Sequence, residues 1–268
     1  MKKNEVMDTP IISVITVCYN VASTIEKTML SVLNQTYENV EYIIIDGNST
    51  DGTVDIIKKY ADRLAYWVSE SDSGIYDAMN KGILRATGKF LIFMNAGDQF
   101  FNEKVLDKCL PYFLQEIDII SGIGYLSGQK WIPAKVTDLS VAFFLKKSLN
   151  HQATFINRKL FQKNLYRTNL KIAGDSIFFF QALIMDNASY VDIPVKIALC
   201  EKPGLSGQEK ESFAELQISI KEILPNRMVS DVDFLIKYYN PAVRMIGGWL
   251  YKMHFLKRIL RFIRTNRR

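Results

Sequence analysis

The first hundred residues alternate strand-like and helix-like segments, and this alternation restricts the fold more than any other feature of the sequence. β-branched or apolar runs predict four strands, in IISVITVCYN, VEYIIID, LAYWVSE and KFLIFMN. Helices are expected after the capping-box pattern Ser23-Thr24-Ile25-Glu26, over 53–60, and in YDAMNKGILRATG with Gly88 as its cap. Strands and helices alternating at this spacing predict an α/β fold, with a mostly parallel sheet covered by helices on both faces.

The alternation is looser beyond residue 100, so fewer elements can be assigned there. The expected elements are a helix near 103–114, a strand near 117–122, two helices around 158–187, an extended YVDIPVKIAL stretch, and helices over most of 211–264. We therefore expect one α/β domain over 1–210, with halves 1–100 and 101–210, followed by a helical C-terminal extension over 211–268.

The composition excludes several classes of protein. Cys18, Cys109 and Cys200 are far apart and form no Cys-x-x-Cys, which argues against a disulfide framework or structural zinc and favours a reducing compartment. The chain shows no signal peptide and no uncharged run of membrane-spanning length, so we expect a soluble or peripheral protein. The formal net charge is +6, yet eight lysines and arginines and no acids lie after residue 240. The preceding body is therefore slightly acidic, which argues against nucleic-acid binding there.

Polar side chains follow every strand of the first half. Tyr19-Asn20 follows the first strand, Asp46 ends the second, the third leads into 70–74, and Asn95 and Asp98 follow the fourth. Because the carboxyl ends of parallel strands share one edge, these residues predict a polar crevice there. Neither G-x-G-x-x-G nor a Walker sequence is present, so a dinucleotide fingerprint and a phosphate-binding loop of that type are excluded.

Asp98 lies one tight turn beyond the apolar run FLIFMN. Asp and Gly commonly end a strand, so a simple turn is one interpretation. A carboxylate-lined crevice that holds phosphates needs a divalent cation between the like charges, and this need favours Asp98 as a metal ligand.

Four motifs, in their order and spacing, resemble the inverting family 2 nucleotide-sugar glycosyltransferases of the GT-A (Rossmann-like) fold. They are PIISVITVCYN, IIIDGNSTDGT, SESDSGIYDAMNKGILRATGKF and LIFMNAGD, and they are most similar to members that build bacterial surface polysaccharides. The resemblance is dense over 10–100 and thinner over 150–207. It implies transfer, with inversion, from a nucleoside-diphosphate sugar (UDP-sugar first among them) to a lipid-linked or saccharide acceptor, with Mg²⁺ or Mn²⁺ as cofactor.

The resemblance also implies donor-binding residues at the end of the first two strands. Thr16, Tyr19 and Asn20 are expected to border the nucleotide base, although a packed Tyr-Asn turn is the alternative. Asp46 is expected to accept a hydrogen bond from the base or ribose. Many relatives have two adjacent acids there, whereas this sequence has Asp46-Gly47.

Further along the chain, Asp77 and Asn80 are three residues apart on one helix face. They are expected at the diphosphate side of the crevice, and a solvated helix face explains them equally well. The family's metal motif, Asp-x-Asp, is replaced here by Asn95-Ala96-Gly97-Asp98, so Asp98 is the one carboxylate expected to hold the metal.

The resemblance implies that Asp175 is the general base that takes the acceptor hydroxyl's proton. Family members place this base just ahead of a helix, usually as Glu-Asp, and here as Gly174-Asp175; helix capping is the alternative. His151 could contact acceptor or diphosphate or be a structural histidine. Ser206, in a Gly-Leu-Ser-Gly sequence, could cover the diphosphate or lie in a surface turn.

The C-terminal sequence FLKRILRFIRTNRR has an apolar face and a basic face at helical spacing. This pattern favours a membrane-surface helix; a helix docked on the body and a nucleic-acid arm are the alternatives. The leading hypothesis is a metal-dependent glycosyltransferase, peripheral on the cytoplasmic face of the cell membrane. A non-catalytic, membrane-docked partner in a polysaccharide assembly is the second hypothesis, supported by the missing Asp-x-Asp.

Overall fold

A computed structural model describes residues 9–200 and 209–238 of the chain. Internal contacts divide the chain into two units, Met1–Ile220 and Lys221–Arg268, and each is described by itself. Every predicted strand and helix of the first hundred residues is present in the first unit. These elements are β1 Ile12–Cys18, α1 Ile25–Leu33, β2 Val40–Asp46, α2 Thr53–Lys58, β3 Tyr66–Ser69, α3 Ile75–Arg85 and β4 Phe90–Phe93.

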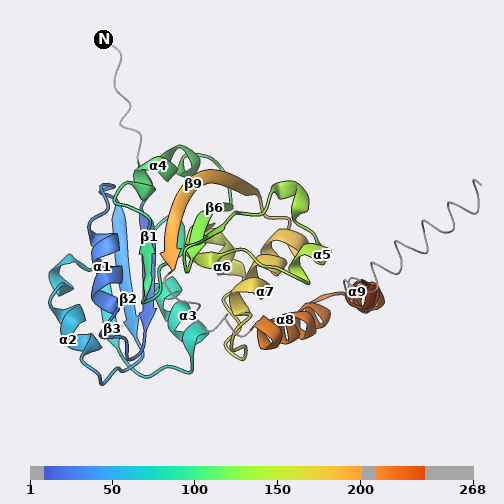
Figure 1. Ribbon diagram of the computed structural model, residues 1–268, viewed down its shortest axis with the longest axis horizontal. Helices are drawn as coiled ribbons and strands as arrows, with labels where there is room; N and C mark the ends of the chain where they lie inside the picture. The colour runs from blue at the N-terminus through green and yellow to red at the C-terminus, as the bar shows by residue number, and fades with distance from the viewer. Residues whose placement is uncertain (1–8, 201–208, 239–268) are drawn as a thin grey trace, which may run out of the picture. The chain divides into compact units, whose positions relative to one another are not determined.

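Helices cover both faces of this part of the sheet, because successive side chains of a strand point to opposite faces. On β1, Val14 belongs to the core cluster that includes Met29 of α1. The next side chain, Ile15, faces α3, where Gly82 comes so close that an added Cβ would lie 2.6 Å from it. Figure 1 shows β1 and β2 side by side with α1 and α3 around them.

The second half of the first unit adds antiparallel pairs to the sheet. Its elements are β5 Asp98–Phe100, α4 Val105–Phe113, β6 Ile119–Leu126, β7 Gln129–Trp131, α5 Val141–Phe144, β8 Thr154–Asn157, α6 Lys159–Lys163, α7 Gly174–Phe180 with a π-helical continuation Gln181–Met185, and β9 Tyr190–Cys200. The sheet order is β3-β2-β1-β4-β8-β6-β9-β5, with β7 paired to β6. Pairings β1–β2, β1–β4, β2–β3 and β6–β9 are parallel, while β8 and β5 pair antiparallel with their neighbours.

Two local predictions are wrong. Helix α1 begins where predicted, but Thr24 makes no side-chain capping hydrogen bond, and Glu26 accepts a hydrogen bond from the Tyr60 hydroxyl instead. Helix α3 ends at Arg85, so Gly88 is not its cap. Gly88 is needed for close approach, since an added Cβ would lie 2.6 Å from Ser13 Oγ and 2.7 Å from the Ile11 carbonyl.

Helices α8 Glu209–Ile223 and α9 Asn226–Tyr238 follow, as predicted for the start of the C-terminal region. The predicted helices beyond 238, with the basic tail, lie outside the described residues, as does Ser206. Within the described ranges, no helix combines the length and the apolar character needed to cross a membrane. Cys18, Cys109 and Cys200 are free and buried.

Candidate active site

The carboxyl ends of β1, β2 and β3 border a polar pocket, as the sequence predicts. Its volume is about 330 Å³, and its lining residues are Tyr19, Gly47, Asn48, Ser71 and Asp72. Tyr19 directly follows β1 and has 64% of its surface exposed, so its ring offers an accessible wall. A flat ring beside carboxylate and amide groups is a suitable surface for a heterocyclic base.

Asp72 also lines this pocket. No role is predicted for it from the sequence, although it stands among the polar residues that follow the third strand. Its Oδ1 accepts the backbone N–H of Gly74 at 2.8 Å, which fixes the carboxylate over the start of α3. Its Oδ2 would lie 2.6 Å from a Cβ at Gly47. The carboxylate of Asp72 therefore occupies the space that a second acid after Asp46 would fill, which explains why glycine stands at position 47.

Asp46 and Thr16 lie beneath the pocket and are both fully buried. The Asp46 carboxylate accepts from the Ser49 amide at 2.9 Å, from the Ser49 and Ser69 hydroxyls at 2.5 and 2.6 Å, and from the Cys18 thiol at 3.4 Å. Thr16 donates to the Met94 carbonyl at 2.6 Å. These side chains tie β1 to β2, β3 and β4, and neither has surface with which to contact a nucleotide in this conformation.

Asn20 is exposed and in the left-handed backbone region, with φ of 51°. Its side-chain oxygen accepts the Thr50 amide at 2.9 Å, and its own amide donates to Ser49 Oγ at 2.7 Å. Asn20 thus holds the 46–52 loop beside Tyr19. It borders the pocket through this loop and is not among the residues that line it.

Asp77 and Asn80 do not share a role, although they share helix α3. Asp77 accepts the Ser73 amide at 3.0 Å and so holds the turn that leads into the helix. Asn80 donates to the Tyr166 carbonyl at 2.8 Å and accepts its amide at 3.0 Å, and this bidentate contact fastens α3 to the 164–170 segment. Both polar atoms of the Asn80 side chain are therefore hydrogen-bonded within the protein.

Asp98 opens β5 after the turn at Gly97, whose φ of +102° requires glycine. The residue is 7% exposed, and burial raises the pKa of its carboxyl. Hydrogen bonds from Cys200 and Gln152 and the charge of His151 only partly oppose this effect. A carboxylate held in such a place is stabilised by a cation brought close to it.

His151 connects this edge with Asp175. A short 3₁₀ turn over His151–Ala153, fixed by Asn150 Oδ1 accepting the Gln152 amide at 3.0 Å, places the imidazole. Its Nδ1 lies 3.0 Å from Asp175 Oδ2, and its Nε2 lies 3.4 Å from Asn95 Nδ2. Burial disfavours the imidazolium, but the hydrogen bond and charge of Asp175, with the charge of Asp98, outweigh it and raise the pKa of His151.

Asp175 is the second residue of α7, and its side chain is 13% exposed. Its Oδ1 lies 3.1 Å from the hydroxyl of Tyr76, which donates to the Ile172 carbonyl at 2.6 Å. The Tyr76 ring packs so close to Gly174 that an added Cβ would lie 2.7 Å from it. This contact explains why glycine directly precedes Asp175.

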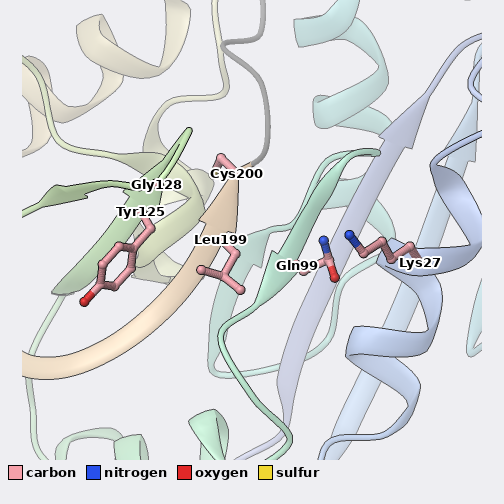
Figure 2. A pocket seen from close by; sticks show the side chains of 6 residues that line it. All are labelled: Lys27, Gln99, Tyr125, Gly128, Leu199 and Cys200. Carbon is pink, nitrogen blue, oxygen red and sulfur yellow. The ribbon is translucent and has the colours of Figure 1, made fainter.

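A second hollow, of about 220 Å³, lies between α1, β5, β6 and β9. Figure 2 shows Lys27 and Gln99 pointing toward one another at one end, Tyr125 at the other, and Leu199 between them. Its lining is largely apolar apart from that end. Cys200, the donor to Asp98, forms part of its wall, so this hollow adjoins the candidate site through one side chain.

Comparison with known proteins identifies the class to which this fold and site belong. The model of the family described as "Glycosyl transferase family 2" matches residues 13–191, and the chain belongs to this family. It is 31% identical over 207 residues to an uncharacterized glycosyltransferase of Mycobacterium tuberculosis, with 72% of this chain and 74% of the relative covered. It is 38% identical over 119 residues to TuaG of Bacillus subtilis, provisionally named as a teichuronic acid biosynthesis glycosyltransferase, with 43% and 47% covered.

Solved structures of glycosyltransferases share the fold. S. aureus TarS residues 1–349 in complex with UDP-GlcNAc gives a TM-score of 0.66 at 17% identity, covering 86% of this chain and 73% of that one. The mannosyltransferase PcManGT from Pyrobaculum calidifontis, in complex with GDP-Man and Mn²⁺, gives 0.65 at 18% identity, covering 88% and 72%. The predicted GT-A fold and the predicted family are confirmed.

Proposed function

We propose that the protein transfers a sugar, with inversion, from a nucleoside-diphosphate sugar to a saccharide or lipid-linked acceptor in the synthesis of a bacterial surface polysaccharide. The observation that carries this proposal is the position of Asp175. Its carboxylate is held by His151 and Tyr76, next to the strand edge that also presents Asp98. A base so oriented is what attack by an acceptor hydroxyl requires.

In this proposal the pocket at Tyr19 and Asp72 receives the nucleotide base. Asp72 takes over the hydrogen-bonding role that the sequence suggested for Asp46, since Asp46 is buried and engaged. A carboxylate accepts well from a ring N–H, and uracil has one on its pairing edge. UDP-sugars are therefore the first donors to examine, and the UDP-GlcNAc bound by TarS supports the same choice.

The residues present fit a divalent cation. Asp98 is a buried carboxylate, and the buried Oδ1 of Asn95 finds no hydrogen-bond partner among the described residues. Oxygen donors of these two kinds suit Mg²⁺ or Mn²⁺, which would neutralise the diphosphate when bound. The described residues contain no cluster of three or more acids, histidines or cysteines, so phosphate oxygens and waters would complete the coordination.

The chemical step follows from the position of Asp175. As the acceptor oxygen attacks the anomeric carbon, Asp175 takes its proton, and the bond from that carbon to the diphosphate breaks with its electrons leaving on phosphate. Attack from the face opposite the leaving group inverts the anomeric centre. His151 holds one carboxylate oxygen, which leaves the remaining lone pairs of Asp175 for the acceptor.

Membrane association is part of the proposal and depends on the basic amphipathic tail after residue 240. A lipid-linked acceptor would require the enzyme at the cytoplasmic face of the membrane, where anionic lipids attract basic residues. The second candidate function, a non-catalytic partner of a polysaccharide assembly, is favoured by the single carboxylate of the metal motif. It predicts no turnover with any donor.

A thermal-shift panel tests the donor assignment. UDP, GDP, dTDP and ADP are added with and without Mn²⁺, since a ligand at about 100 times its Kd stabilises by roughly 2.7 kcal/mol. We expect UDP with Mn²⁺ to raise the melting temperature most. Stabilisation by none of them would contradict nucleotide-sugar binding, and stabilisation by all without Mn²⁺ would contradict the metal assignment.

A further inference from the structure

The side chain of Glu215 on helix α8 contacts the loop that carries Asp175. The carboxylate of Glu215 accepts three consecutive backbone N–H groups, from Lys171, Ile172 and Ala173, each at 2.8 Å. Burial opposes the charge of Glu215, but these three hydrogen bonds and the nearby Lys171 outweigh it and lower its pKa. A carboxylate with three backbone donors fixes the path of the chain into α7.

The same peptide segment is fixed from its other side by Tyr76. The Ile172 amide donates to Glu215, and the Ile172 carbonyl accepts the Tyr76 hydroxyl at 2.6 Å. That hydroxyl also lies 3.1 Å from Asp175 Oδ1. One peptide group therefore connects Glu215 of α8 with a side chain that touches the proposed base.

The single proton of the Tyr76 hydroxyl decides what this arrangement does. It is shared between two acceptors, the Ile172 carbonyl at 2.6 Å and Asp175 Oδ1 at 3.1 Å. The position of the Ile172 carbonyl therefore sets where the Tyr76 hydroxyl meets the Asp175 carboxylate.

We propose that Glu215 is a positioning residue for catalysis, which holds the Ile172 peptide so that the Tyr76 hydroxyl stays in place against Asp175. The inference rests on the proposed function, because it takes Asp175 as the base. It makes α8 part of the catalytic apparatus, although no residue of α8 belongs to the motifs of the family resemblance. Without Glu215, the Ile172 carbonyl is free to move, and the Tyr76 hydroxyl that it holds loses its fixed place beside Asp175.

Kinetics of three variants of the full chain test this inference. Nucleoside-diphosphate release from UDP-GlcNAc, UDP-glucose and GDP-mannose is measured with Mn²⁺ for wild type, Glu215→Ala, Glu215→Gln and the control Glu211→Ala. Glu211 is exposed one helical turn earlier on α8. We expect Glu215→Ala to lower kcat by up to about 100-fold with KM changed less than about twofold, since displacement of a catalytic group affects mainly the chemical step.

Glu215→Gln keeps one accepting oxygen and should be intermediate, and Glu211→Ala should match wild type. Tyr76→Phe should lower kcat as well, and its combination with Glu215→Ala should cost little more than the larger single loss, because both act through Ile172. Wild-type kcat in a folded Glu215→Ala protein, or fully multiplicative losses in the double variant, would overturn the inference.

Hydrogen exchange provides a measurement that does not depend on activity. The amides of 171–173 should exchange slowly in wild type and much faster in Glu215→Ala, while β1 and β4 amides stay equally protected. Unchanged exchange at 171–173 would overturn the holding role of Glu215. Failure of the proposed function is distinguishable, because wild type itself would then release no nucleotide from any donor while the exchange difference persists.

Discussion

The imidazole Nδ1 of His151 lies 3.0 Å from the Asp175 carboxylate, and its opposite nitrogen lies 3.4 Å from the side-chain nitrogen of Asn95. One histidine thus joins the proposed base to the residue that begins the metal motif. Both contacts are made with side-chain exposures of 17% for His151 and 13% for Asp175. His151 is therefore placed to orient Asp175, a structural role that the sequence analysis gives as the alternative to acceptor or diphosphate contact.

His151→Ala tests this placement. Because the ring orients the base, we expect kcat to fall while the affinity for UDP with Mn²⁺ changes by less than about threefold; misorientation of a catalytic group can cost up to about 100-fold. Steady-state kinetics and calorimetric titration measure the two quantities. A loss of UDP affinity as large as the loss of kcat would instead place His151 at the diphosphate.

Asp98→Ala tests the metal assignment. In saturating Mn²⁺ the variant should bind UDP more weakly than wild type, because its metal ligand is gone. Without metal the two proteins should bind alike, or the variant slightly better, since a carboxylate that repels phosphate has been removed. Equal affinities in Mn²⁺ would return Asp98 to the role of a turn residue.

The variants Asp72→Asn and Asp46→Asn should differ in UDP affinity and in melting temperature. A hydrogen bond to a charged group is worth about 1.5–3 kcal/mol, so Asp72→Asn should weaken UDP binding by about tenfold or more at little cost in melting temperature. Asp46→Asn should lower the melting temperature, because its buried donors lose their acceptor, and leave UDP affinity intact if the protein folds. The reverse pattern would restore Asp46 as the nucleotide contact.

The lowered pKa of Glu215 predicts a pH-dependent stability. A carboxyl whose folded pKa lies below its ordinary value near 4.5 stabilises the fold above that value and loses this contribution as pH falls through the folded pKa. The melting temperature of wild type should therefore exceed that of Glu215→Gln at pH 7, and this difference should disappear below about pH 4. A difference that stays constant to pH 3 would show that the charge of Glu215 does not stabilise the loop.

Removal of residues 252–268 tests the membrane proposal. The deletion takes away seven lysines and arginines, each worth about 1 kcal/mol near an anionic surface. The shortened protein should no longer co-sediment with anionic vesicles and should still bind UDP. High salt should mimic the deletion only partly, because apolar contacts are not screened. If the shortened protein is unfolded and the intact chain does not bind vesicles, the tail belongs to the protein core.

The strand and helix pattern of the first hundred residues could be predicted because each segment has a clear apolar period of its own. Val40–Asp46, for example, is a strand with the predicted bounds. Gly88 could not be interpreted in this way, because its reason is a close approach to Ser13, 75 residues away. A glycine after a helix has the same local sequence whether it caps the helix or packs against a strand.

In the candidate site too, some features could be predicted from the sequence and others required the fold. Asp175 and His151 could be selected from sequence, yet their contact required the fold. Asp46 ends one strand and Asp72 follows the next, and only burial separates the structural acid from the accessible one. Glu215 belongs to no recognisable motif. Its partners are backbone amides about 43 residues earlier, and the amino-acid sequence does not show which side chain a backbone amide will bind.

Sugar transfer by Asp175→Asn, compared with nucleotide binding by the same protein, tests the central claim most directly. The measurement pairs product formation from the active donor with UDP titration in Mn²⁺. Because the base acts on the acceptor and not on the donor, transfer should fall by about 10²- to 10⁴-fold while UDP affinity stays within about twofold of wild type. Undiminished transfer by Asp175→Asn would contradict the account.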